Sequence, residues 1–106
     1  MVSFREFQAL DLRVGKILAV ENVPNADKLY KLFVDIGEKE ITLVAGLRPY
    51  YKPEEMKGKK IIVVVNLDPV VLKGVKSEGM LLAAQEGDKV SLLTVDRDLK
   101  PGSKVS

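Results

Sequence analysis

Apolar residues at the start of the chain follow the spacing of a helix. Ser3-Phe4-Arg5-Glu6 has the S-x-x-E form of a capping box, and Phe7 and Leu10 follow it. This pattern predicts a two-turn helix over residues 4–10, with Phe4, Phe7 and Leu10 on one face.

From residue 12 onward the spacing of apolar residues becomes two, which is typical of strands. The phase slips at Gly15-Lys16, which predicts a long first strand with a bulge or sharp bend there. After a turn-rich segment at residues 23–27, alternation resumes up to Ile36, and residues 37–39 predict a hairpin turn before a partner strand from Ile41 to Ala45.

The remaining elements are short. Pro53 predicts one helical turn over residues 53–56, residues 60–67 predict a strand, and residues 79–85 and 89–95 predict a final strand pair. Five or six short strands, no βαβ rhythm and no internal repeat predict an all-β domain spanning residues 1–106. Among small barrels the oligonucleotide/oligosaccharide-binding (OB) fold fits best. We expect a five-stranded antiparallel barrel with a short N-terminal helix and a C-terminal strand extension.

Two segments, residues 61–65 and 90–95, are apolar on both faces of the predicted strands. Strands of a solvated barrel alternate, so the outer faces of these two need a cover. Either the N-terminal helix and the C-terminal tail supply it, or a partner subunit does. The small size of the chain favours a homodimer.

Composition limits the function classes. The chain has no cysteine and no histidine, which excludes a thiolate metal site and a cysteine nucleophile, and removes the commonest metal ligand and general base. We therefore expect a binding protein with no enzymatic activity, no cofactor and no metal. No apolar run is long enough to span a membrane and no secretory signal opens the chain, so a cytoplasmic location is expected.

The net charge of +2 is unevenly distributed. Residues 48–76 hold seven Lys or Arg against three Asp or Glu, whereas the flanking segments are slightly acidic. A local excess of positive charge attracts nucleic-acid backbones, although a solvated lysine-rich surface would look the same.

Two polar clusters border the predicted strands. The first contains Asn25 and Lys28 and could be a turn or a ligand-contacting loop. The second runs from Asn66 to Met80 and contains two lysines, a serine and two glycines beyond residue 72, as phosphate-contacting loops often do. It lacks the spacing of a Walker A loop.

An ordered series of motifs links these clusters to a known family. The series comprises residues 11–17 (DLRVGKI), 24–30 (PNADKLY), 34–37 (VDIG), 45–47 (AGL), 65–67 (VNL) and 73–82 (KGVKSEGMLL). In order and spacing it resembles the tRNA-binding domain at the C-terminus of methionyl-tRNA synthetases, which also exists as a free-standing homodimer. The resemblance covers residues 4–106 and implies an OB barrel that binds tRNA by shape, without catalysis.

The chain departs from the family pattern at two positions. Val23 stands where the family often has His, and Ala45 stands where it often has Ser. Each departure removes a hydrogen-bonding group near the expected site.

The residue types needed to bind RNA are cations for phosphates, amides and hydroxyls for 2′-hydroxyls and base edges, and apolar groups for stacking. Met80, Phe33 or Tyr30 could stack on bases, although Met80 could equally belong to the core, and Tyr50-Tyr51 could either stack or pack a loop. We expect the contact residues to sit outside the core. The predicted tRNA-binding residues are Asn25, Lys28, Asn66, Lys73, Lys76, Ser77 and Met80.

The sequence thus predicts a tRNA-binding homodimer, either free-standing or acting as the detached β subunit or C-terminal domain of a methionyl-tRNA synthetase, whose tRNA affinity it would raise. The alternative is a protein-binding module on the same barrel, similar to a bacterial export chaperone. A chaperone would show a larger exposed apolar groove.

Overall fold

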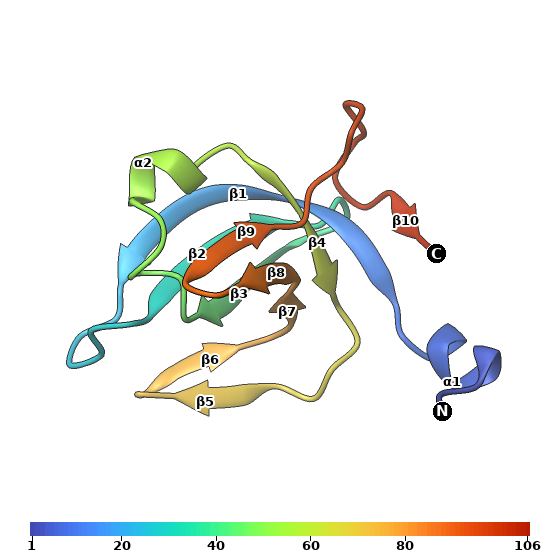
Figure 1. Ribbon diagram of the computed structural model, residues 1–106, viewed down its shortest axis with the longest axis horizontal. Coiled ribbons are helices and arrows are strands. Elements are labelled where there is room, and N and C mark those ends of the chain that lie inside the picture. Colours follow the sequence, from blue (N-terminus) through green and yellow to red (C-terminus); the bar gives the residue numbers. More distant parts are fainter.

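β1 (Leu12–Asn22) is the long central strand of the computed structural model, which describes residues 1–106 (Figure 1). Its first half pairs antiparallel with β4 (Lys60–Val64) and its second half with β2 (Tyr30–Asp35). β3 (Glu40–Ala45) continues the sheet beside β2, and β7 (Met80–Leu81) continues it beside β4. The order β3-β2-β1-β4-β7 curls into a nearly closed barrel, which confirms the predicted five-stranded OB-type architecture.

Two short hairpins and a short C-terminal strand are added to this barrel. The hairpins are β5 (Val70–Leu72) with β6 (Val75–Ser77), and β8 (Ala83–Glu86) with β9 (Lys89–Leu92). β10 (Lys104–Val105) pairs with the start of β1 and is the predicted C-terminal strand extension.

The two helices are short, and neither has the length and apolar character needed to cross a membrane. α1 (Phe4–Gln8) has the predicted capping box between Ser3 and Glu6, but ends two residues before the predicted boundary. α2 (Pro53–Met56) begins at proline, as predicted.

The predicted irregularity in β1 lies at a different position. The register shift occurs between Ile17 and Ala19, on the side paired with β2, and the prediction of a slip at Gly15-Lys16 is wrong. Gly15 pairs regularly with Ile61, and a Cβ there would lie 2.7 Å from Cγ1 of Val34. Glycine is needed at position 15 because a side chain there would collide with Val34 on the neighbouring strand β2 and crowd Val63 on β4.

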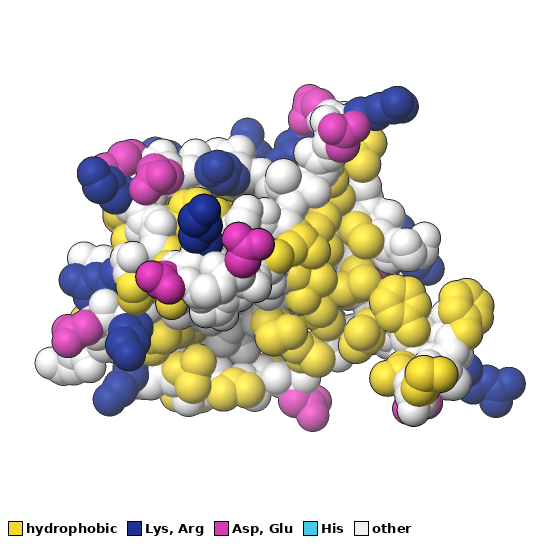
Figure 2. Space-filling view, viewed as in Figure 1, with side chains coloured by type: hydrophobic (Ala, Val, Ile, Leu, Met, Phe, Trp, Pro, Cys, Tyr) yellow, Lys and Arg dark blue, Asp and Glu magenta, His cyan; other side chains and the backbone are white.

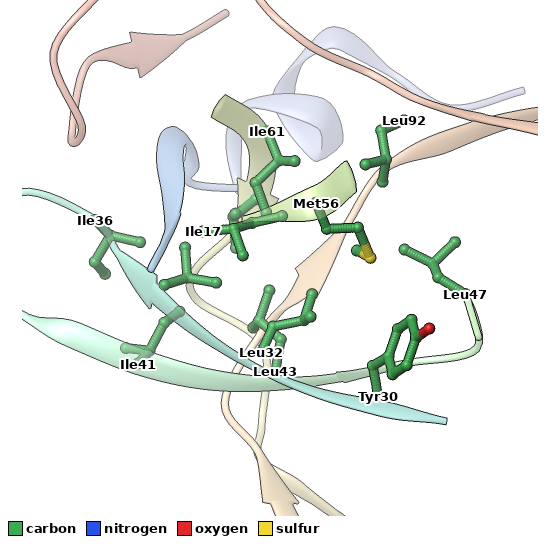
Figure 3. Packing of buried hydrophobic residues seen from close by; sticks show 12 residues of the cluster. Ile17, Tyr30, Leu32, Ile36, Ile41, Leu43, Leu47, Met56, Ile61 and Leu92 are labelled. Atoms are coloured by element: carbon green, nitrogen blue, oxygen red, sulfur yellow. The ribbon is translucent and has the colours of Figure 1, made fainter. Parts of the chain in front are cut away.

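Inward-facing residues of the strands fill the barrel (Figure 3). Met56 of α2 lies over one end of the barrel and is completely buried, together with Ile17 and Leu32. Tyr30 is also part of this cluster, and its hydroxyl donates a hydrogen bond to the carbonyl of Tyr51 at 2.6 Å. The prediction that Tyr30 could stack on bases is therefore wrong.

The strand that is apolar on both faces is covered within one chain. Ile61 and Val63 point into the barrel, whereas Ile62 and Val64 lie on the outer face and are still only 7% and 3% exposed. Leu12 and Val14 of β1 are their register partners and are equally buried. The expectation that β4 needs a partner subunit as a cover is wrong.

Candidate nucleic-acid interface

β3 is the edge strand of the sheet, and the N–H groups on its free edge donate to side chains at the end of β6 and immediately after it. The backbone N–H groups of Thr42 and Val44 point away from β2. The carboxylate of Glu78 accepts from the Thr42 N–H at 2.7 Å, and the hydroxyl of Ser77 accepts from the Val44 N–H at 3.0 Å. The Glu78 N–H donates to the Thr42 carbonyl at 2.8 Å. These bonds close the barrel and fix the base of the β5–β6 hairpin against β3.

Glu78 is held in its charged form at this position. The hydrogen bond from the Thr42 backbone is the main cause that lowers the pKa of Glu78 below its ordinary value of 4.5, and the Thr42 hydroxyl and nearby Lys76 act in the same direction. The Glu78 carboxylate is thus a permanent structural acceptor near neutral pH.

The β5–β6 hairpin presents Lys73 at its tip. Lys73 and Gly74 have φ of 51° and 79°, the left-handed conformation of a two-residue type I′ turn. The polar residues between Asn66 and Met80 predicted a phosphate-contacting loop, and this hairpin was not predicted. Lys73 and Lys76 are both exposed. Lys76 pairs with Val71 across the hairpin, so their side chains share the face opposite to Ser77.

The β1–β2 loop, residues 23–29, is hydrogen-bonded to the segment that follows β3. The Arg48 N–H donates to the Lys28 carbonyl, and the Arg48 guanidinium donates to the Ala26 carbonyl, both at 3.3 Å. Asn25 has φ of 61°, so it serves as a turn residue, and its side chain and that of Lys28 are exposed. This loop and the tip of the β5–β6 hairpin lie at the same end of the barrel, on the left of Figure 1.

Val23 does not line the surface of this loop. Val23 is only 1% exposed. Val23 is therefore a packing residue of the loop, and Asn25 and Lys28 supply exposed polar groups.

Two outward-facing residues of β2 lie between the loop and the hairpin. Lys31 and Phe33 are half-buried cross-strand partners of Val44 and Thr42, and the Lys31 ammonium lies 4.9 Å from the centre of the Phe33 ring. Phe33 was a candidate from the sequence, whereas Lys31 was missed. The alternation of residues 31–36 placed Lys31 on the solvent face, and this was the signal that could have identified it.

A groove opens between the β5–β6 hairpin and β3, with a volume of about 220 Å³; we call it the hairpin groove. Five of its eight lining residues are hydrophobic. The eight are Val44, Leu67, Asp68, Val70, Leu72, Ser77, Gly79 and Met80.

Met80 is 52% exposed on the wall of this groove. Met80 therefore lies at the surface and not in the core. Tyr51 is half-buried and packs against the core, and its hydroxyl accepts from the Leu92 N–H at 3.1 Å, whereas Tyr50 is exposed. Loop packing is therefore the structural role of Tyr51.

Ser77 and Asn66 differ from the expectation of free surface groups. Ser77 is 7% exposed, and its hydroxyl also donates to the Gly79 carbonyl at 3.1 Å, so the prediction that it sits outside the core is wrong. The Asn66 amide accepts from the Asp11 N–H at 2.8 Å and donates to the Ala9 carbonyl at 2.7 Å. Asn66 thereby ties the end of α1 to the end of β4, away from the hairpin tip.

The remaining charged groups form few ion pairs. Lys60 contacts Asp98, and Arg13 pairs with Asp11 at 2.6 Å. The structure has no group of three or more acidic side chains that could hold a metal ion.

Known proteins similar to this chain share one domain type. The family model described as a putative tRNA binding domain matches residues 12–104. Methionine–tRNA ligases from Pyrococcus furiosus and Thermotoga maritima are 56% and 49% identical over 98% and 99% of this chain. The chain spans about 14% and 17% of the length of these two relatives.

Solved structures of similar length have the same fold. A protein related to methionyl-tRNA synthetase from Pyrococcus horikoshii superposes with a TM-score of 0.94 at 39% identity, covering 100% of this chain and 98% of that one. The chaperone CsaA from Picrophilus torridus superposes with a TM-score of 0.92 at 37% identity, covering 100% of both chains.

Proposed function

This chain belongs to the putative tRNA binding domain family, and on that basis we propose that it binds tRNA by shape and catalyses no reaction itself. The observation that carries the proposal is the position of the β1–β2 loop and the β5–β6 hairpin. The hairpin is hydrogen-bonded to β3 and the loop to Arg48, which follows β3, and both present exposed lysines at one end of the barrel. In OB folds the face of strands 2 and 3 and the two neighbouring loops are the usual oligonucleotide surface.

Each proposed contact residue has a separate role. Lys28, Lys73 and Lys76 neutralise phosphates, the exposed Asn25 amide contacts 2′-hydroxyls or base edges, and Met80 supplies an apolar contact. We add Lys31 with Phe33 as a charged and aromatic pair on the same face. Ser77 and Asn66 act by positioning their loops, because their polar atoms already bond to the backbone.

The similar methionine–tRNA ligases suggest where the binding is used. In the proposed arrangement the domain, covalently joined or as a separate subunit, binds tRNA weakly and keeps it near a synthetase catalytic site. Tethering of this kind raises the effective tRNA concentration without new specificity.

We also propose that the domain is a symmetric homodimer. α1 buries none of its residues, and Phe4 is 73% exposed on it. A groove of about 340 Å³ separates α1 from the C-terminal residues, and Figure 2 shows hydrophobic side chains spread over this side of the molecule. Apolar surface of this kind favours a partner subunit, and a two-fold axis would present two equivalent tRNA-binding faces.

The test of tRNA binding is a fluorescence anisotropy titration with labelled total tRNA, with duplex DNA as competitor. We expect micromolar or weaker affinity and poor competition by duplex DNA. Equal competition by duplex DNA would contradict recognition by shape.

One observation favours a second function, polypeptide binding. The hairpin groove is lined mainly by hydrophobic residues, and CsaA chaperones have the same fold. Copurifying RNA, detected as ultraviolet absorbance that ribonuclease removes, would favour the tRNA function over this alternative.

A further inference from the structure

The hairpin groove leaves large apolar side chains exposed without a structural reason. Val70 and Met80 are each 52% exposed, and Leu67 and Leu72 are each 39% exposed. All four line the same concavity. Exposed apolar residues that gather around a concave site indicate binding of an apolar surface.

The walls of the groove are held in place before any ligand binds. Register pairs Val70 with Ser77 and Leu72 with Val75, so Val70, Leu72 and Ser77 share the groove face of the hairpin. The hydrogen bond from the Val44 N–H to the Ser77 hydroxyl fixes this face against β3. A site of this kind loses little conformational entropy when it is filled.

Charges around the groove select the type of occupant. The one charged residue that lines it is Asp68, so a phosphate inside would be repelled. Lysines are instead placed at its borders: Lys73 follows Leu72 at the hairpin tip, and Lys31 is the cross-strand partner of Val44. This distribution suits a flat uncharged group inside the groove, joined to a polyanion that passes outside it.

We propose that the hairpin groove receives one unstacked nucleobase of the bound tRNA. The inference rests on the proposed tRNA binding and names a contact within it. Single-stranded RNA is typically recognised through splayed bases packed on apolar or aromatic side chains, while cations bind the flanking phosphates. Asp68 supplies an acceptor for an exocyclic amino group, which favours adenine, cytosine or guanine over uracil.

The methionines provide a direct test. In chain uniformly labelled with ¹³C at its methionine methyls, the Met80 methyl reports on the groove, whereas the fully buried Met56 methyl reports on the core. On addition of total tRNA we expect the Met80 signal to move upfield, through the ring current of a stacked base, while the Met56 signal stays in place. Among single-stranded RNA hexamers, oligo(A) and oligo(C) should move the Met80 signal more than oligo(U).

Two variants of strand β5 distinguish a contact in the groove from a contact elsewhere on the hairpin. Leu72→Ser removes an apolar wall, whereas Val71→Ser changes an exposed valine on the opposite face of the same strand. We expect Leu72→Ser to weaken tRNA binding roughly fivefold or more, as loss of a base-stacking contact does, and Val71→Ser to leave it unchanged. Circular dichroism of both variants should match that of the unaltered chain.

Two results overturn the inference while leaving tRNA binding intact. One is saturating tRNA binding, measured by anisotropy, with an unmoved Met80 signal. The other is a Met80 shift produced by an unstructured peptide of alternating Leu and Ser but not by tRNA, which would make the groove a polypeptide site. Absence of any tRNA binding by anisotropy would refute both proposals.

Discussion

The hydroxyl of Ser77 accepts a hydrogen bond at 3.0 Å from the backbone N–H of Val44, a donor on the free edge of β3. This bond, together with the one from Thr42 to Glu78, replaces the missing strand pair that would close the barrel. It also joins the hairpin that carries Lys73 to the outer face of β2 and β3. One serine therefore links barrel closure to the shape of the proposed tRNA surface.

Ser77→Ala should destabilise the fold. It leaves the Val44 N–H without its acceptor, and an unsatisfied buried donor costs about 1–3 kcal/mol. We expect the urea unfolding midpoint to fall accordingly, and Ser77→Thr to restore part of the loss. A midpoint equal to that of the unaltered chain would show that water or the backbone readily replaces the hydroxyl.

Asn25 calls for a different substitution, because its φ of 61° is unfavourable for alanine. Asn25→Gly keeps the left-handed turn and removes only the amide. We expect Asn25→Gly to retain the stability of the fold while weakening tRNA binding by about 1 kcal/mol, as expected for a lost hydrogen bond. If Asn25→Gly binds tRNA normally in the anisotropy titration, Asn25 is only a turn residue.

Lys73→Asn should change stability and binding in opposite directions. Asn-Gly is the preferred pair for a type I′ turn, so thermal unfolding should occur at the same or a higher temperature. Removal of the charge should weaken tRNA binding and lower the slope of log K against log salt by about 1. Lys100→Asn removes an exposed lysine from the segment between β9 and β10, and is the matched control. Most of this segment lies far from the hairpin tip in Figure 1. Equal losses of affinity in the two variants would indicate nonspecific charge attraction.

Glu78 should make part of the stability dependent on pH. Because the hydrogen bond from the Thr42 backbone lowers its pKa below 4.5, its stabilising contribution is present at neutral pH and is lost as pH falls through the lowered value. Glu78→Gln should be less stable than the unaltered chain at pH 7, and the difference should shrink below pH 4.5. Urea unfolding at both pH values measures this. Parallel curves with a constant difference would contradict the assignment.

The proposed dimer can be tested with two separate substitutions by aspartate. We expect the dimer interface to include residues 92–95 as well as α1. Leu93 is 37% exposed, whereas Leu92 is in the core, so Leu93 is the outward residue of these two leucines. Leu93→Asp would bury an unpaired charge in a dimer and should give monomers or aggregates. Val71→Asp places the same charge on the hairpin and should not affect assembly.

Sedimentation equilibrium decides this prediction. We expect twice the chain mass of 11.7 kDa for the unaltered protein and for Val71→Asp. A single-chain mass for the unaltered protein at tens of micromolar would refute the dimer.

The barrel could be predicted from the sequence because its strands alternate. Leu32, Val34 and Ile36 are buried as the period of two predicts, and the capping box of Ser3 and Glu6 forms. The position of the β1 irregularity could not be predicted, because Gly15 is required by the approach of Val34, a contact distant in sequence. The burial of Ile62 and Val64 within one chain could not be predicted either, because it depends on their pairing with β1, which is distant in sequence.

The candidate site was predictable in its segments but not in the role of each residue. Lys73 and Lys76 were identified correctly as exposed, whereas Ser77, one residue further, is buried. A two-residue turn at Lys73-Gly74 sets which residues of the hairpin face β3, and lysine is an unusual first residue for such a turn. The polar composition of residues 66–80 therefore located the surface without distinguishing contact residues from positioning residues.

Backbone amide NMR of ¹⁵N-labelled chain, titrated with total tRNA, tests most directly whether tRNA binds at the surface formed by the loop and the hairpin. We expect the largest shifts in residues 23–31, 42–46 and 70–80, and little change at residues 96–101, which lie away from both loops in Figure 1. Shifts confined to α1 and the C-terminal residues, or no shifts at saturating tRNA, would contradict the proposed interface.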